Sequence, residues 1–476
     1  MDSRTPVLVG AAAATSHDGD VDELDLIAEA LAAAVTDAGV PGLVGRAGLI
    51  AVPRGTWRHP DPGRLLAARF GATARTVTGE VGVLQTALIA RVCAAIAAGE
   101  ADIAVVAGGE ATASARRRGE TTRPASAGAG EGALADEVLA PSGELISPIE
   151  AARGLWTPAH QYALIESTLG RSVAALNELW AGWSAIAAAN PDAWRRELVD
   201  AASLAWGLPS NPPVAYPYGR RHCSQMNVDQ AGALILTSAA TADALGVRRD
   251  RWVFPWVIAE SNDVVAIGRR ARLDRSPGFA AIAAALGAHL GVPATTADLV
   301  DLYSCFPSAV EVQRREFGFP DDRPLTVTGG MSFAGGPFNN YVVQSTVRTA
   351  QLLRDGDGTS ALVTAISGMI SKQGAMWWSA APPPVGYRYL DVTAAVAAST
   401  RRVPLVADPD HAAGQGTVVA STVVAGDPPV AWALVDLATG ERTLASTSAT
   451  EVTTAWTQHS PIGSRITVSG AELRVR

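Results

Sequence analysis

The chain has 476 residues, of which 48 % are hydrophobic and 18 % are charged, so it can bury a large core and is not disordered as a whole. The net charge of −8 and the lack of a long basic tract argue against a nucleic-acid binder. The three cysteines, Cys93, Cys223 and Cys305, show no CxxC spacing, which argues against a disulfide framework and against a metal site.

Taken in chain order, short β-rich runs alternate with amphipathic helices up to about residue 380. Strands are expected at Val7–Gly10, Gly48–Val52, Ile103–Gly108, Ala233–Thr237, Val253–Glu260, Leu299–Leu302 and Ala361–Ala365. Helices are expected at Asp22–Ala38, Leu84–Ala98, Gly278–Leu290 and Tyr341–Leu353. Strands separated by helices predict parallel βαβ units in a layered α/β fold.

A short internal repeat divides this region into two halves. The sequence Thr76-Val77-Thr78-Gly79 recurs as Thr326-Val327-Thr328-Gly329. Each copy opens a glycine-containing turn, which is followed by a helix and by a strand that ends in glycine. We therefore expect two βαβαβαβ halves whose helices are buried against each other between two sheets.

The pattern breaks between Glu110 and Gln225, where we expect an inserted lobe. Residues 112–135 are rich in Ala, Gly, Ser and Arg and predict an irregular loop. A helical stretch is expected from Ala163 to Trp206, and its tryptophans are expected to pack the lobe onto the main body.

After about residue 390 the helices are expected to stop. Five β-like runs follow, at Val403–Ala407, Thr417–Val424, Val430–Leu437, Arg442–Ser446 and Arg465–Val468. They predict a small all-β domain of the OB type. Because this segment has few aromatic residues and no basic stripe, it favours a protein-contact or lid role over nucleic-acid binding.

The start of the helix near Gly82 is one candidate site, because the N-terminus of a helix lowers the pKa of a cysteine and makes it nucleophilic. The turn holds no cysteine, and Cys93 lies about 13 Å along the helix, where it is expected to pack in the core. Cys305 follows the strand that ends at Leu302, and it has no activating base nearby in the sequence.

Two further segments combine glycine with polar residues. In the turn after Gly329, either the side chains of Asn339 and Asn340 line a pocket, or the turn is an ordinary strand-to-helix connection in which Asn340 caps the next helix. Lys372 is the only lysine in the chain and lies beside a glycine turn, where it either meets an anionic group or is a solvated surface residue.

Together these features resemble the thiolase superfamily over about residues 1–385. The resemblance rests on Ile96 through Gly109-Glu110, Gly329-Gly330 to Gly336-Pro337, Pro158 to Glu166, Asn190 to Trp194, and Val228 to Ala231. The last three segments resemble an actinobacterial branch often labelled acetyl-CoA acetyltransferase. The extra C-terminal domain resembles that of the mycobacterial thiolase-like type 1 proteins. The resemblance implies a thiolase fold with residues 1–251 as the first half, a lobe at about 110–225, residues 252–390 as the second half, and 391–476 as the extra domain.

The residues that the resemblance places at the catalytic positions differ from those of thiolases. The nucleophilic cysteine falls on Gly82, the histidine of the G-H-P motif on Gly336, the Asn or His of a third motif on Tyr303, and the second cysteine on Ala365. Losing the nucleophile removes the covalent route altogether, so thiolase activity itself is predicted to be absent although the family is one of acyltransferases.

The resemblance implies that a coenzyme A pocket is kept. At the end of the lobe, Arg220, Arg221 and His222 either meet the phosphates of CoA or form a solvated basic loop. With them we group Asn339, Asn340 and Lys372 as ligand-binding candidates. No covalently bound cofactor is expected.

Three functions are consistent with these residues. The first is a catalytically degenerate thiolase-fold protein that binds CoA or an acyl-CoA in lipid metabolism. The second is a retro-aldol lyase that acts on a β-hydroxyacyl-CoA through Tyr303, and the third is an interaction module that docks a partner through residues 391–476. No apolar run reaches the ~18 residues of a membrane helix, so a cytoplasmic location is expected. A monomer is slightly favoured over the usual thiolase homodimer.

Overall fold

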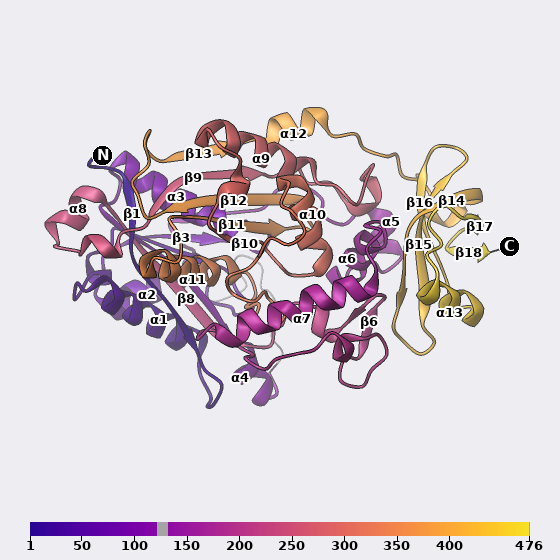
Figure 1. Ribbon diagram of the computed structural model, residues 1–476, viewed down its shortest axis with the longest axis horizontal. Coiled ribbons are helices and arrows are strands. Elements are labelled where there is room, and N and C mark those ends of the chain that lie inside the picture. The colour runs from indigo at the N-terminus through magenta and orange to yellow at the C-terminus, as the bar shows by residue number, and fades with distance from the viewer. Residues whose placement is uncertain (121–131, 476) are drawn as a thin grey trace.

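Two mixed β-sheets form the body of the protein, which the computed structural model describes over residues 1–120 and 132–475 (Figure 1). The first sheet has the order β1 (Pro6–Thr15), β8 (Asp229–Ser238), β4 (Ile103–Ala111), β2 (Leu49–Pro53), β3 (Arg75–Gly79) and β5 (Glu137–Leu139). From β4 to β5 the strands are parallel, as predicted. The strand β8 lies between β1 and β4 and runs antiparallel to both, so this sheet is mixed.

The second sheet repeats this plan. Its order is β10 (Leu299–Asp301), β11 (Ser360–Ser367), β12 (Lys372–Ser379), β9 (Phe254–Ser261) and β13 (Arg388–Asp391). The strand β12 was not predicted, because its polar start at Lys372 and Gln373 is typical of a turn. It pairs antiparallel with both β11 and β9 and corresponds to β8 of the first sheet.

Helices lie between the two sheets and on both outer faces. The helices α3 (Gln85–Ala98) and α11 (Tyr341–Asp355) share one apolar cluster with strands of both sheets, as the repeat predicts. The first sheet is covered outside by α1 (Glu23–Ala38) and α2 (Pro62–Phe70), and the second by α9 (Pro277–Leu290) and α10 (Pro307–Phe317). The body therefore has the α-β-α-β-α layering of the thiolase fold.

The two copies of the repeat differ in structure. Thr76 to Gly79 form β3, whereas Thr326 to Gly329 do not form a strand. The reason is the buried carboxylate of Asp301, which accepts hydrogen bonds from the amides of Val327 and Thr328, both at 3.0 Å. These amides are therefore not available to a neighbouring strand.

The lobe contains α4 (Thr112–Arg117), α5 (Pro148–Ala152), α6 (Pro158–Ser167) and α7 (Val173–Ala189). The predicted irregular loop is thus helical at its start, while residues 121–131 lie outside the described part of the chain. The expected helix from Ala163 to Trp206 is broken at Gly170, which has a φ of 68°, and α7 ends before Asn190-Pro191. Trp180 and Trp183 are buried and stacked, which confirms their packing role.

The C-terminal strands close into a small barrel, which confirms the all-β prediction. The order is β15 (Val430–Leu437), β16 (Arg442–Thr447), β18 (Glu472–Val475), β17 (Arg465–Ser469) and β14 (Ala413–Val424), and β14 also pairs with β15. The predicted strand at Val403–Ala407 is wrong: Pro404 lacks an amide hydrogen, and the segment contributes one isolated bridge at Leu405. The expectation that helices stop at residue 390 is also wrong, because α12 (Thr393–Ser399) and α13 (Thr450–Gln458) follow.

The barrel is docked firmly on the lobe. The short strand β6 (Pro213–Ala215), which also pairs with β7 (Tyr218–Gly219), extends the barrel sheet beside β14, and the Tyr216 amide donates to the Val423 carbonyl at 2.9 Å. Ala420, Leu434 and Leu444 of the barrel belong to the same apolar cluster as the residues of α6. The remaining short helix, α8 (Ala239–Ala244), follows β8. Across the described helices, none is both long and apolar enough to cross a membrane.

Candidate functional site

The turn before α3 places Lys372 against Gly82. Gly82 has a φ of 97°, a conformation that favours glycine. The Nζ of Lys372 donates to the Gly82 carbonyl oxygen at 2.9 Å and lies 3.8 Å from where a Cβ at position 82 would stand. Lys372 is only 2 % exposed, and burial lowers the pKa of its amine. The Lys372 amine therefore lies close to the place where a side chain at position 82 would stand.

The glycine-rich turn before α11 is tied to the turn before α3 by amide side chains. Asn339 accepts from the Gln85 side chain at 3.2 Å and donates to the Arg54 carbonyl at 3.0 Å. Gln85 also accepts from the Val342 amide at 2.9 Å. Asn340 donates to the Gly108 carbonyl at 2.9 Å, while its buried Oδ1 has no donor among the described residues. The N-termini of α3 and α11 thus meet at these amides.

The segment after β10 brings Tyr303 beside Ala365. The Tyr303 amide donates to the hydroxyl of Thr364, the residue before Ala365, at 2.7 Å. The phenol ring packs edge-on against Tyr341, with ring centroids 5.7 Å apart. Burial raises the pKa of the Tyr303 phenol, so this group stays protonated.

The end of the lobe connects this segment to the turn that holds Gly336. The Ser224 amide donates to the Cys305 carbonyl at 3.1 Å, and the Gly336 amide donates to the Gln225 carbonyl at 2.9 Å. A Cβ at Gly336 would collide with the Ser224 hydroxyl, whose oxygen is buried and has no partner in the described chain. The four positions that the resemblance assigns to catalysis are therefore linked through short chains of contacts.

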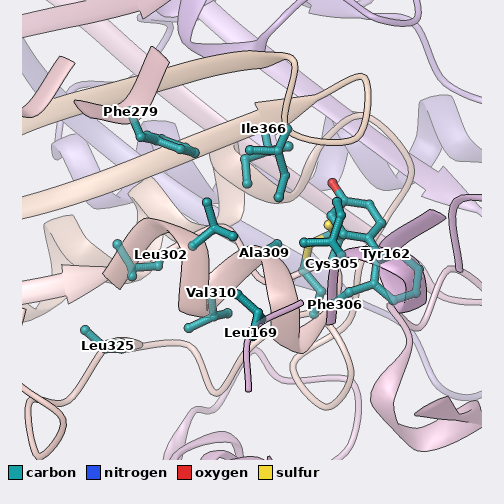
Figure 2. Packing of buried hydrophobic residues seen from close by; sticks show 14 of the residues in the cluster. Tyr162, Leu169, Phe279, Leu302, Cys305, Phe306, Ala309, Val310, Leu325 and Ile366 are labelled. Atoms are coloured by element: carbon teal, nitrogen blue, oxygen red, sulfur yellow. The ribbon is translucent and has the colours of Figure 1, made fainter. Parts of the chain in front are cut away.

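None of the cysteines is placed for nucleophilic chemistry. Cys93 is fully buried in the core of α3, and burial raises the pKa of its thiol. Cys305 packs beside Tyr162 and Phe306 (Figure 2), and burial raises the pKa of its thiol to about 12. Cys223 is affected in the same way, with a pKa of about 12. All three behave as small apolar residues, as the sequence predicted for Cys93.

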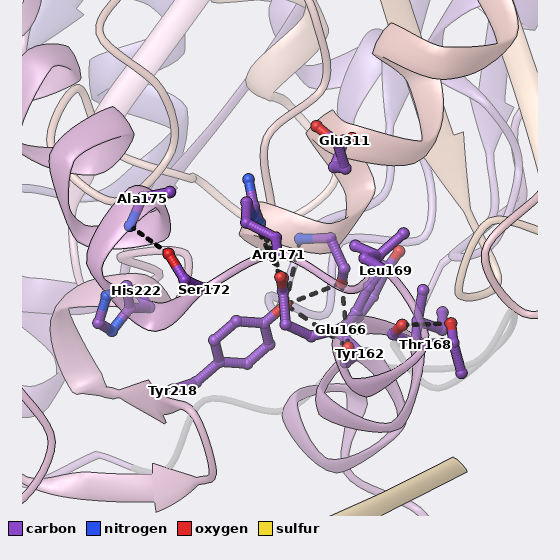
Figure 3. A network of polar contacts seen from close by, with 12 residues as sticks. Tyr162, Glu166, Thr168, Leu169, Arg171, Ser172, Ala175, Tyr218, His222 and Glu311 are labelled. Carbon is purple, nitrogen blue, oxygen red and sulfur yellow. Dashed lines mark hydrogen bonds and ion pairs between the residues drawn. The ribbon is translucent and has the colours of Figure 1, made fainter. Parts of the chain in front are cut away.

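The three basic candidates at the end of the lobe have different environments. His222 is fully buried, accepts from the Gly219 amide at 3.2 Å and contacts the Asn177 side chain at 2.9 Å (Figure 3 labels its ring). Burial lowers its pKa to about 4, so His222 is neutral and does not face a ligand in this conformation. Arg220 is exposed, and Arg221 is paired with Glu197 at 3.2 Å.

A buried polar network holds this end of the lobe against α10 (Figure 3). Arg171 donates two hydrogen bonds of 2.9 Å to the carboxylate of Glu166. The Tyr218 hydroxyl contacts the same carboxylate at 2.7 Å and Ser308 of α10 at 2.8 Å. The arginines that follow Tyr218 are therefore next to a buried network of hydrogen bonds that fixes the end of the lobe.

Arg195 was missed by the sequence analysis. Burial lowers the pKa of its guanidinium, and the charges of Arg221 and Arg220 lower it further, while the charge of Glu197 acts in the opposite direction. Its amide donates to the Phe333 carbonyl at 2.8 Å, so it borders the glycine-rich turn before α11. No local motif marks this residue, because about 25 residues separate it from the other two arginines.

The structure shows no candidate metal site: within residues 1–120 and 132–475, no three His, Cys, Asp or Glu side chains are arranged to hold an ion. Comparisons based on sequence alone find no matching family model and no matching curated protein.

Comparison with solved structures gives clear matches. The chain aligns over 100 % of its length, and 100 % of the other chain, with a monomeric SCP2-thiolase-like protein type 1 from Mycobacterium smegmatis, at 26 % identity and a TM-score of 0.83. An Ltp2-ChsH2(DUF35) aldolase aligns with 79 % of this chain and 98 % of its own, at 19 % identity and a TM-score of 0.60. The acetyl-CoA acetyltransferase of Syntrophomonas wolfei aligns with 79 % and 99 %, at 17 % identity and a TM-score of 0.57.

The last two matches show the fold alone, whereas the first also includes the extra C-terminal region. The layered body and the small C-terminal all-β domain agree with the resemblance seen in the sequence. The chain therefore has the thiolase fold, and over its whole length it is similar to the SCP2-thiolase-like protein type 1 from Mycobacterium smegmatis.

Proposed function

We propose that this protein binds CoA or an acyl-CoA in lipid metabolism without performing thiolase chemistry. The observation that carries the proposal is that the segment holding Arg195 and the end of the lobe holding Arg220 and Arg221 both bond to the glycine-rich turn before α11 and are joined by the Arg221–Glu197 ion pair. Guanidinium groups bind phosphate oxygens through paired hydrogen bonds, and CoA carries several phosphates.

The residues around the two helix N-termini support the same ligand. The Ser224 hydroxyl and Asn340 Oδ1, for which the described residues provide no partner, lie next to Gly336 and Gly108, respectively. These oxygens can accept hydrogen bonds, and a pantetheine arm contains amide donors. Buried acceptors without partners are costly in a folded protein, so a ligand that satisfies them is favoured.

The same geometry argues against a thiolase reaction. At Gly82 there is no thiol, and the nearest functional group is the Lys372 amine, which is bound to the Gly82 carbonyl. At Gly336 the space for a larger side chain is taken by Ser224. A covalent acyl-enzyme on sulfur therefore has no residue to form it.

Titration calorimetry with CoA, acetyl-CoA and a long-chain acyl-CoA tests this proposal. We expect saturable binding that weakens with added salt, because phosphate contacts are largely electrostatic. Replacing Arg195 and Arg221 by glutamine is expected to weaken binding about tenfold or more. Thiolysis of acetoacetyl-CoA is expected to be absent in every variant.

The matched control is Arg465→Gln on the barrel strand β17, an exposed arginine remote from these two, which should leave the affinity unchanged. Absence of heat with all three ligands, or equal affinity in the control and the Arg195 and Arg221 variant, would contradict the proposal.

A retro-aldol reaction through Tyr303 is the second candidate, supported by the fold likeness to an aldolase. Burial keeps the Tyr303 phenol protonated, so it could donate a proton but could not remove one at neutral pH. A β-hydroxyacyl-CoA that is cleaved by the unmodified protein and not by Tyr303→Phe would select this function. Equal cleavage rates would remove it.

The docking of the barrel on the lobe determines how the third candidate function, an interaction module, can be tested. Removing residues 391–476 would cut off the last residue of β13 and would expose the apolar cluster that α6 shares with β14. A pull-down comparison with that truncation would thus report unfolding as well as partner loss. Charge-reversing substitutions on the exposed barrel surface are the suitable test.

We propose that the protein is a monomer in solution. The usual thiolase dimer joins the strand that corresponds to β3, and here β5 of the same chain pairs with β3 from Val77 to Gly79. That edge therefore has its hydrogen-bonding groups already engaged. Sedimentation equilibrium is expected to give the mass of one chain, 49.0 kDa, and a mass of twice that value would contradict the proposal.

A further inference from the structure

A cavity of about 220 Å³ opens on the outer side of the second sheet, away from the site described above. It lies between the N-terminus of α9, the turn joining β11 to β12, and the segment that follows α12. Four arginines line it, namely Arg270, Arg272, Arg275 and Arg401, whereas Asp263 is the only acidic residue of the lining. Arginines therefore outnumber acidic residues in the lining of this cavity.

Two of these charges have no acidic partner. Arg272 is paired with Asp274, and Arg275 with Glu316 at 2.7 Å. Arg270 donates through Nε to the Val265 carbonyl at 3.0 Å, and neither it nor the exposed Arg401 forms an ion pair within the described chain. Burial lowers the pKa of Arg270 to about 10, so it remains charged at neutral pH. The charge of Glu150 offsets part of the burial effect on Arg270, but no carboxylate of the described chain lies at ion-pair distance. A partly buried cation in that position favours an anionic ligand.

The N-terminus of α9 adds to this potential. Ser276 caps the 14-residue helix by accepting from the Phe279 amide at 3.3 Å, and the first turn of α9 lines the cavity. Pro277 has no amide hydrogen and the Phe279 amide is bound to Ser276, so the Gly278 amide and the helix dipole are what favour a negative group here.

Two acceptors of the lining are also without donors. Gln373 is only 4 % exposed; its Nε2 donates to Ser276 Oγ at 3.2 Å, but its Oε1 has no donor in the described residues. The same holds for Oδ2 of Asp263, while its Oδ1 accepts from Arg402 at 2.7 Å. A ligand that carries a donor, such as a hydroxyl, would satisfy them.

We propose that this cavity binds a small phosphorylated alcohol, with its phosphate held by Arg270 and Arg401 at the N-terminus of α9 and a hydroxyl directed at Gln373. The volume is below the ~300–1,000 Å³ that drug-sized ligands need, which suits a ligand of a few carbon atoms rather than a whole nucleotide cofactor.

The cavity is separate from the proposed CoA site. Successive residues of a strand point to opposite faces of the sheet. Lys372 of β12 faces Gly82 and the inner helices, whereas the next residue, Gln373, contacts Ser276 and the outer helix α9. The two ligands are therefore expected to bind together without competing.

Titration with inorganic phosphate and with glycerol 3-phosphate tests the inference on the full chain. Both probes are expected to bind, and glycerol 3-phosphate more tightly because it adds hydroxyl donors. Arg401→Gln and Arg270→Gln are each expected to weaken binding about tenfold, the loss typical of one charge-assisted contact. Because Arg401 is exposed, its replacement leaves the fold intact even if Arg270→Gln does not.

The control is Arg248→Gln, which removes an exposed arginine that is paired with Asp250 and does not line the cavity. It should change the affinity less than twofold. The inference is overturned if neither probe binds at about 10 mM, if Arg401→Gln binds as the control does, or if saturating CoA displaces glycerol 3-phosphate. Failure of CoA to bind would leave this experiment unaffected, so the two proposals fail separately.

Discussion

Replacing Asp301 by alanine is expected to destabilise the fold by about 3–5 kcal/mol, one of the largest losses available to a single substitution in this chain. Asp301 is 1 % exposed, and its Oδ2 accepts from the amides of Val327 and Thr328 and from the hydroxyls of Thr326 and Thr328. Its Oδ1 accepts from Tyr341 at 2.9 Å and from Ser345 at 2.9 Å. Alanine would leave these donors buried without an acceptor.

Asparagine at position 301 is expected to cost much less. The amide oxygen can keep the four donors on the Oδ2 side, and the amide nitrogen can donate to the two hydroxyls, which then act as acceptors. Urea unfolding of the unmodified protein, Asp301→Ala and Asp301→Asn measures the difference in the free energy of unfolding. The comparison requires that the three proteins show the same dependence of this free energy on urea concentration.

Asp298→Ala is the matched control. Its Oδ2 also accepts from two amides and two hydroxyls, those of Thr359 and Ser360, but the residue is exposed and water can replace the carboxylate. We expect a loss of about 1 kcal/mol or less there. Equal losses at positions 298 and 301 would show that burial of the donors does not set the cost.

The second large effect concerns pH. Glu110 is 1 % exposed and accepts from the Thr56 amide at 2.8 Å and from the Thr56 hydroxyl at 2.6 Å. Burial raises its pKa to about 8 from an ordinary value of 4.5. The folded protein thus holds this proton at pH values where the unfolded chain has lost it. The stabilisation is complete below about pH 4.5 and is lost as the pH rises through 8, at up to about 1.4 kcal/mol per pH unit.

Glu110→Gln is expected to remove most of this dependence, since an amide keeps both contacts to Thr56 and does not ionise. Urea unfolding at pH 5, 7 and 9 should show a steep fall in stability for the unmodified protein and a shallower one for the variant. A residual slope is expected from Glu260, whose pKa burial raises to about 7. The exposed Glu451→Gln serves as control, and identical slopes in all three proteins would refute the role of Glu110.

The layered body was predictable because its strands and inner helices are almost wholly apolar, and such runs have few alternative structures. The strand β12 was not, since Lys372 and Gln373 become buried only through contacts with Gly82 and Ser276, which are about 290 and 100 residues away. The helix α13 was also missed. It is rich in threonine, which favours strands, and it is held by Val452 and Trp456 packing on the barrel.

In the candidate site, too, some features were predictable from the sequence and others depend on contacts between distant residues. Sequence comparison within the chain located the turns before α3 and α11, because glycine marks positions where the backbone needs a positive φ. It could not distinguish the exposed Arg220 from the buried His222, two residues away, since that difference depends on Asn177 and the surrounding lobe. The contribution of Arg195 likewise arises only in three dimensions.

The attachment of the barrel has a consequence for the integrity of the chain. Between α12 and β14 the connecting segment is largely exposed. The barrel is nevertheless held to the lobe by the β6–β14 contact and a shared apolar cluster, and to the second half by Arg442, which donates to the Arg270 carbonyl at 2.6 Å. A protease that cuts this connection would separate the polypeptide into two pieces without releasing either. An intact peptide bond is thus not needed at this point once folding is complete, and the two fragments would remain bound to each other as a single particle.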